Sequence, residues 1–270
     1  MMIIRPSRGW SFPDLREVWA YRELIYFFAW REIKVRYKQT VLGAAWAVIQ
    51  PLFTMVVFTI FFGNFAKIPS EGVPYAIFAY TALVPWSYFA NAVSQASNST
   101  AGQRGIITKV YFPRLVIPIS SLLSGLPDFA IAFAVLIAMM VYYGILPTFA
   151  TLLVPLLLLF SMTTALAVGL WLSALNAIYR DVQYAVPFLI QFWLFATPIA
   201  YPSSLVPARW RPIYGINPMA GVVEGFRWCL LGSGTGLDSM FAISVLAVFL
   251  LLITGVVYFR HMEREFADLV

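Results

Sequence analysis

Few residues in this chain are of types that carry out covalent chemistry. His261 and Cys229 are the single histidine and single cysteine among 270 residues. The sequence has no GxxxxGK[ST] phosphate loop, no GxSxG nucleophile elbow and no HExxH zinc motif. One histidine cannot act as the base for many scattered serines and threonines, and one cysteine cannot form an intrachain disulfide. We therefore expect no catalytic residues, no metal site and no resident cofactor in this chain.

Asp128 is unusual because it lies within a long apolar run, directly after Pro127 in LLSGLPDFAIAF. A carboxylate at membrane depth is a candidate proton or cation site. Alternatively, Pro118, Gly125 and Pro127 interrupt a helix, and Asp128 caps the second half. Because no second intramembrane carboxylate or histidine could relay a proton, we favour the cap.

Two stripes at helical spacing combine aromatic rings with side-chain amides. Aromatic rings stack on the apolar faces of sugar rings, and amides exchange hydrogen bonds with sugar hydroxyls. Ordinary packing between helices produces the same pattern, and the pattern alone favours packing. The first stripe is Trp46, Gln50 and Phe53, and the second is Tyr184, Phe188, Gln191 and Phe195.

The composition indicates which elements carry these side chains. The chain is 61% hydrophobic and 11% charged, whereas soluble domains average roughly 45–50% and 25%. A membrane-spanning helix needs about 20 apolar residues. We therefore predict an all-α integral membrane protein with six transmembrane helices, at residues 40–63, 75–101, 115–143, 148–175, 184–200 and 240–259.

The segment at residues 14–38 precedes the first predicted span and differs from the spans in its charge. Charged residues bracket the short run LIYFFAW, and the segment is rich in aromatic and basic residues. This pattern predicts an amphipathic helix in the membrane interface, or alternatively the start of the first span. The predicted domains are a cytoplasmic N-terminus at 1–39, a transmembrane domain at 40–260 and a cytoplasmic tail at 261–270.

The basic residues predict the orientation. Fourteen of the 18 lysines and arginines fall on the side of the membrane that contains the N-terminus. Loops rich in these residues remain in the cytoplasm, so both termini are expected there, in an inner membrane protein. The start MMIIRPSRGW lacks the features of a cleaved signal peptide. The charges form no continuous basic face of the kind that binds nucleic acid.

The last outer loop, at residues 201–238, is too long for a hairpin turn and too apolar for a solvated domain. Four prolines precede an apolar run of about fourteen residues, so two short re-entrant or interfacial helices that join near Asn217 and Pro218 are expected. Glu224 and Arg227 lie at i and i+3, where they can pair. Such a pair either latches the two halves of the hairpin or is simply solvated.

Three segments resemble the transmembrane subunits of ABC-type polysaccharide exporters, which are the O-antigen and capsule permeases. They are REIKVRYKQTVLGAAWAVIQPL at 31–52, ITKVYFPRLVIPISSL at 107–122 and INPMAGVVEGFRW at 216–228. The resemblance extends over nearly the whole chain, and the middle segment is more similar to O-antigen permeases.

The resemblance implies a homodimer that works with two copies of a separate ATPase, where ATP and Mg²⁺ bind. It implies a channel lined by the first and fifth spans, which favours the channel interpretation of both stripes, and an outer gate at 201–232 that includes Asn217, Pro218, Glu224 and Arg227. It implies export of a lipid-linked polysaccharide; the alternatives are export of drugs or small lipids, or an ion-coupled lipid flippase centred on Asp128. The expected ATPase contacts are Arg31, Lys34, Arg104, Lys109, Arg114, Arg180 and Asp181.

Overall fold

A computed structural model describes residues 15–38, 43–107, 109–207, 209–234, 236 and 238–263. Within these ranges all regular structure is helical. The helices are α1 (Leu15–Ala20), α2 (Arg22–Lys38), α3 (Trp46–Phe58), α4 (Tyr75–Gly102), α5 (Arg104–Ile107), α6 (Val116–Ser124), α7 (Leu126–Tyr142), α8 (Val154–Ile178), α9 (Val182–Ala196), α10 (Arg211–Tyr214), α11 (Pro218–Leu231) and α12 (Ser239–Met262).

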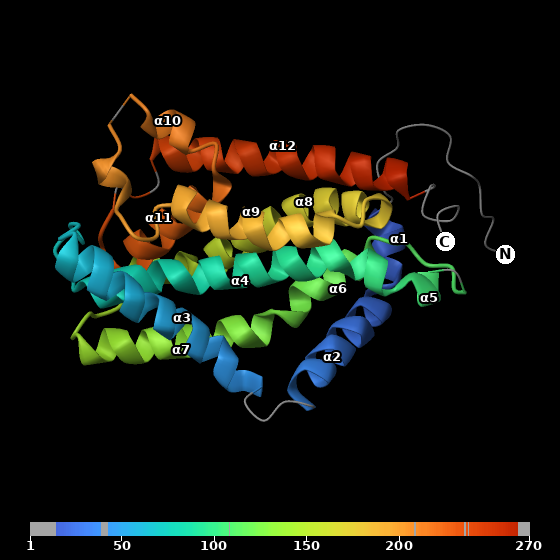
Figure 1. Cartoon of the computed structure of the whole chain (residues 1–270), viewed down its shortest axis with the longest axis horizontal. Coiled ribbons are helices and arrows are strands. Elements are labelled where there is room, and N and C mark those ends of the chain that lie inside the picture. Colours follow the sequence, from blue (N-terminus) through green and yellow to red (C-terminus); the bar gives the residue numbers. More distant parts are fainter. Residues whose placement is uncertain are drawn as a thin grey trace.

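The long helices form an elongated bundle (Figure 1). The helices α1 and α5 lie at one end of the bundle, together with the end of α12, and α10 and α11 lie at the opposite end. A π-helical segment at Thr59–Phe65 continues α3, and a 3₁₀ turn at Phe149–Leu153 leads into α8.

Within the part of the chain that the structure describes, four helical segments are long and apolar enough to cross a membrane: Trp46–Phe65, Val116–Tyr142, Phe149–Ile178 and Ser239–Met262. They lie where the sequence predicts the first, third, fourth and sixth spans. The other two predicted spans coincide with α4, which is 28 residues long but less apolar, and with α9, an apolar helix of 15 residues. The helix α9 ends four residues earlier than predicted because the chain turns at Thr197 and Pro198.

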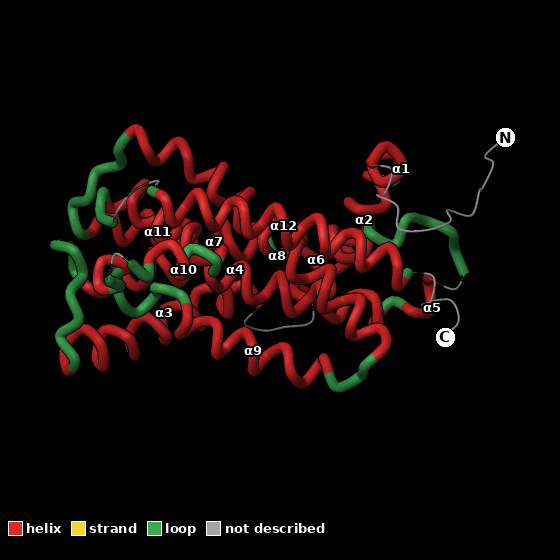
Figure 2. Tube along the Cα trace, turned by 90° about the horizontal axis from the view of Figure 1, so that it is seen from above, coloured by secondary structure: helices red, strands yellow, loops and turns green. Residues whose placement is uncertain are grey.

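The most buried long helix among the described residues is α4, which lies near the centre of the bundle in both views (Figures 1 and 2). It packs against α8, α6, α11, α7 and α3. Polar contacts join α4 to α8: the hydroxyls of Thr100 and Ser173 are 2.6 Å apart, and Asn176 donates to the carbonyl of Ser97 over 3.0 Å. Because hydrocarbon offers these groups no partners, such contacts specify how two apolar helices align.

A small residue sets the distance between α4 and α8. A Cβ atom at Gly169 of α8 would lie 2.7 Å from the Cβ of Ala96 in α4. Small residues at helix interfaces allow backbones in a membrane to approach closely. The α4–α8 contact therefore depends on the glycine itself.

The third predicted span is interrupted at Gly125, between α6 and α7, as the prolines and glycine of that region indicate. Pro127 has no N–H with which to bond a carbonyl of the preceding turn. The hydroxyl of Tyr88 donates to the carbonyl of Leu122 over 3.1 Å. Tyr88 thus satisfies a backbone carbonyl next to the break.

The N-terminal segment differs from the expected single amphipathic helix. Its described part forms two helices, α1 and α2, separated at Tyr21. Phe28 of α2 is buried against Phe112 and Val116, whereas Tyr26 and Phe27 remain largely exposed. Both faces of α2 are thus aromatic, with charged residues between them, and the helix does not separate into one apolar and one polar face.

Candidate functional site

A groove runs between α3 and α9, and α4 forms its floor. Its volume is about 420 Å³. Gln50, Asn91 and Gln191 contribute amides, and Trp86 and Phe195 contribute aromatic rings. Hydroxyls of Thr54, Ser87 and Ser94 also line it, and none of its lining residues carries a charge. Such a surface can exchange hydrogen bonds with a polyhydroxylated ligand without binding any one position tightly.

A second cavity, of about 390 Å³, lies on the other side of α3 and is bounded by α4, α7 and the end of α2. Gln50 and Pro51 of α3 and Ser87 and Asn91 of α4 line both cavities, so α3 lies between two hollows that share these four residues. Unlike the groove, this cavity carries charge, because Arg36 and Asp128 lie in its wall.

Asp128 does not cap α7, contrary to the sequence-based expectation. Among the described residues the cap position is Gly125, and no side chain caps this helix. Arg36 and Tyr37 of α2 both donate to the carboxylate of Asp128, and Arg36 also donates to Gln95 of α4. Burial, together with Asp128, raises the pKa of Tyr37 to about 12, so its phenol remains a donor. Asp128 therefore anchors the N-terminal helix to the bundle.

The two predicted stripes lie on open surfaces of α3 and α9. Trp46 is 56% exposed, Tyr184 76% and Phe188 72%, so neighbouring helices of the same chain do not bury them. Of the stripe residues, Gln50, Gln191 and Phe195 line the groove, and Trp46 lines the second cavity. Phe53, Tyr184 and Phe188 line neither. The helix α9 lies at the edge of the bundle (Figure 2), with Val186 as its one buried residue.

The polar residues of α4 that form the floor of the groove were not predicted from the sequence. Ser87, Asn91 and Ser94 recur at helical spacing and line the groove. The same spacing rule that selects the stripes on α3 and α9 would have selected them.

The predicted ATPase contacts fall into two groups. Lys34, Lys109, Arg180 and Asp181 are exposed, and Arg31 is half-buried with its guanidinium 5.2 Å from the ring centre of Phe28. Arg114 instead bonds within the chain, donating to the carbonyl of Glu263 over 2.6 Å. Burial raises the pKa of Glu263, and Arg260 and Arg114 act in the opposite direction. The side chain of Arg104 lies outside the described residues.

Arg227 belongs to α11, at the end of the bundle that also contains α10 (Figure 1). It is fully buried and pairs with Glu224 over 3.1 Å, so the pair is not solvated. Its guanidinium donates to the carbonyls of Pro198 and Ile199 over 2.6 and 2.7 Å and lies 3.6 Å from the ring centre of Phe78. One side chain thus joins α11 to α4 and to the segment after α9.

Asn217 caps α11 and also joins it to α9. Its side-chain oxygen accepts from the backbone of Met219 and from the indole of Trp193, over 3.1 and 2.9 Å. Its amide nitrogen donates to the carbonyl of Ala196 and to the hydroxyl of Thr197. Pro218 occupies the first helical position, where no N–H is needed. Before this junction α10 is a single turn, and the first of the two expected short helices is therefore very short.

The model of the ABC-2 type transporter family matches residues 23–231. The chain belongs to this family. The match includes α2, the groove and α11. An O-antigen export system permease protein RfbA of Myxococcus xanthus is 30% identical over 79% of this chain and 82% of that protein. An RfbA of Klebsiella pneumoniae is 29% identical over 89% of this chain and 92% of its own length.

A third relative of this ABC-2 type transporter is the polysialic acid transport protein KpsM of Escherichia coli. It is 23% identical over 87% of this chain and 91% of that protein. The three relatives thus match most of the chain and most of their own lengths. The family membership confirms the resemblance based on the three sequence segments.

Proposed function

We propose that this chain is the permease subunit of an ATP-driven exporter that moves a lipid-linked polysaccharide across the inner membrane. The observation that carries the proposal is the uncharged groove between α3, α4 and α9 in a chain whose relatives are named for O-antigen and polysialic acid export. Amides, hydroxyls and aromatic rings suit a sugar polymer that presents many hydroxyls. A conduction path must bind weakly at several positions so that its cargo can leave.

The transported polymer passes between two copies of the chain in this proposal. The groove is open on the surface of the single chain, and the aromatic residues beside it are exposed. A second copy would close the groove into a channel. The proposed topology has six spans, formed by α3, α4, α6 with α7, α8, α9 and α12, with both termini in the cytoplasm.

ATP hydrolysis takes place in a separate subunit in this proposal, since the chain has no phosphate loop. The exposed residues Lys34, Lys109, Arg180 and Asp181 are the proposed contacts with that subunit. Arg114 contributes to this interface only indirectly in the proposal. Its hydrogen bond to the carbonyl of Glu263 holds the loop that carries Lys109. At the other end, α10 and α11 form the proposed outer gate, which Arg227 and Asn217 hold closed.

The test is reconstitution of the permease with its ATPase in liposomes, followed by measurement of ATP-dependent movement of a lipid-linked polysaccharide. We expect transport to require both subunits. The double variant Gln50→Ala/Gln191→Ala should reduce transport at least tenfold while both subunits still co-purify. The matched control is Asn64→Ala, which removes an exposed amide that lines neither cavity.

Two results would contradict this proposal. Movement of glycolipid by the permease alone on an ion gradient would support the flippase centred on Asp128. ATP-dependent export of small amphipathic drugs with no movement of polysaccharide would support the drug-export branch of the family.

A further inference from the structure

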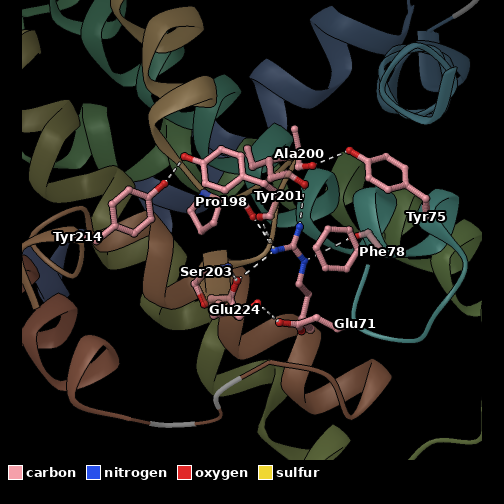
Figure 3. Close-up of polar contacts among 12 residues, drawn as sticks. Glu71, Tyr75, Phe78, Pro198, Ala200, Tyr201, Ser203, Tyr214 and Glu224 are labelled. Carbon is pink, nitrogen blue, oxygen red and sulfur yellow. Dashed lines mark hydrogen bonds and ion pairs between the residues drawn. The ribbon is translucent and has the colours of Figure 1, made fainter. Parts of the chain in front are cut away.

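Two carboxylates from distant parts of the sequence meet beside α11. Glu71 lies in the loop between α3 and α4, and Glu224 lies in α11 (Figure 3). The consecutive residues Ser203 and Ser204 each donate a hydrogen bond to one of these carboxylates. The backbone N–H of Ser203 donates to Glu224 Oε1 over 3.3 Å, and the hydroxyl of Ser204 donates to Glu71 Oε1 over 2.9 Å.

The other oxygen of each carboxylate has no partner. In the described parts of the chain, eight buried side-chain nitrogen or oxygen atoms lack a hydrogen-bond partner, and four of them belong to the two carboxylates, to Ser203 and to Ser233, the residue before Gly234. They are Glu71 Oε2, Glu224 Oε2, Ser203 Oγ and Ser233 Oγ. Glu224 and Ser203 are each 1% exposed. Leaving several polar atoms unsatisfied at one buried place is costly, so the cluster indicates a ligand.

The backbone of Gly234 closes the cluster on one side. A Cβ atom at Gly234 would lie 2.9 Å from Glu224 Oε2 and 4.0 Å from Glu71 Oε2, so both unpartnered oxygens face the same glycine. Gly234 has φ +95°, which only glycine adopts readily, and the preceding residue is Ser233. Glu71 itself has φ +55°, an unusual conformation for a residue with a side chain. Strained backbone of this kind accompanies functional constraint.

The charge of the cluster determines which ligand fits. The guanidinium of Arg227 donates to Glu224 Oε1 and to backbone carbonyls. It therefore does not pair with Glu224 Oε2. A proton shared by the two carboxylates would satisfy their two unpartnered oxygens and leave the two serine hydroxyls without a partner. A hard cation, in contrast, can be bound by carboxylate and hydroxyl oxygens together. Carboxylate and hydroxyl oxygens suit Ca²⁺, which accepts irregular geometry more readily than Mg²⁺ does.

We propose that Glu71, Glu224, Ser203 and Ser233 form a Ca²⁺ site that joins the α3–α4 loop, the segment before α10 and the end of α11. The site does not depend on what the protein transports. Because these three segments lie far apart in the sequence, an ion bound between them stabilises their packing. Ca²⁺ therefore strengthens the same end of the bundle that Arg227 holds together.

The test is thermal unfolding of the purified full-length chain after chelation, with CaCl₂, MgCl₂ or NaCl titrated back at fixed ionic strength. A ligand that binds only the folded state raises the melting temperature in proportion to its affinity. We expect Ca²⁺ to raise it saturably and Na⁺ to leave it unchanged. Glu71→Gln should weaken the Ca²⁺ response about tenfold or more, in line with the loss of one metal-site group. The matched control is Glu23→Gln, the same change at an exposed position of α2.

Direct Ca²⁺ binding by isothermal titration calorimetry, with Ser203→Ala as a second variant, covers the case in which Glu71→Gln fails to fold. An equal Ca²⁺ response in Glu71→Gln and Glu23→Gln would overturn the proposal. So would a melting temperature that responds to pH but not to Ca²⁺, since that result indicates a shared proton.

Discussion

Arg227 carries a charge at a fully buried position, and its neighbours show how the fold tolerates this. The carboxylate of Glu224 and the carbonyls of Pro198 and Ile199 all accept from the guanidinium. A buried charge without such partners is strongly destabilising, whereas a fully bonded arginine specifies one geometry. The side chain therefore determines how α11 sits against α4 more than it adds to stability.

Glu32 of α2 is partly buried, and among the described residues it forms no ion pair with an arginine of the kind that Glu224 forms with Arg227. Ser121 and Gln103 donate to its Oε1 over 3.3 and 3.4 Å. Burial raises the pKa of Glu32 above its ordinary value of 4.5, and hydrogen bonds from Ser124 and Ser121 and the charges of Arg31 and Arg36 only partly oppose this shift. The folded state therefore binds the proton more tightly than the unfolded state does.

Stability should consequently fall as pH rises above 4.5 toward the raised pKa of Glu32, where its carboxylate becomes charged in the folded protein. Glu32→Gln removes this loss and keeps an oxygen that accepts from Ser121. We expect its melting temperature to match the wild type at or below pH 4.5, to exceed it increasingly as pH rises toward the raised pKa of Glu32, and to exceed it by a constant amount above that pKa. Equal melting temperatures throughout this range, or the same gain in Glu23→Gln, would contradict this account.

The close contact between α4 and α8 depends on the absence of a side chain at Gly169. Gly169→Ala places a Cβ atom 2.7 Å from that of Ala96. We expect a destabilisation of about 1–3 kcal/mol, because both residues lie in packed interior. Adding Ala96→Gly should restore most of the loss, as a double-mutant cycle of thermal unfolding would measure. Gly102→Ala is the control, since no atom lies within 4 Å of its added Cβ. Absence of rescue would indicate that the helices shift apart instead.

The helices themselves were largely predictable from the sequence, because long apolar runs and their Pro and Gly boundaries are local features. The break at Gly125 and the start of α11 at Pro218 follow from such local signals. The partner of Asp128 could not be predicted in this way, because Arg36 lies 92 residues away in the sequence and only tertiary packing brings the two side chains together. The carboxylate pair of Glu71 and Glu224 escaped prediction for the same reason.

The candidate site was predicted only in part, again because of packing. Gln50 and Gln191 are on stripes recognisable by helical spacing, and both line the groove. The floor of the groove comes from α4, whose polar residues are spread along a helix that is otherwise buried. The spacing of polar residues in one helix does not indicate which other helices pack against that face. Asn91 therefore could not be assigned to the groove from the sequence.

At the scale of the whole molecule, α3 and α9 form one face that contains the uncharged groove. Exposed aromatic residues of both helices also lie on this face. Under the proposed function this face lines a water-filled path that widens when the ATPase binds ATP. A path of this kind becomes reachable by small water-soluble reagents, whereas a face against lipid does not. The two possibilities can therefore be separated by chemical labelling.

We predict that single cysteines at positions 46, 50, 184 and 191 react faster with a water-soluble thiol reagent when the ATPase is trapped with ATP. The background is Cys229→Ala, which removes the single, fully buried native cysteine. Leu159→Cys is the control, because Leu159 of α8 is 56% exposed but lines neither cavity. Its labelling should stay low in both states, since the proposed topology places it against lipid. If all four positions remain as unreactive as position 159, both stripes face lipid or another helix, and the groove is not part of the transport path.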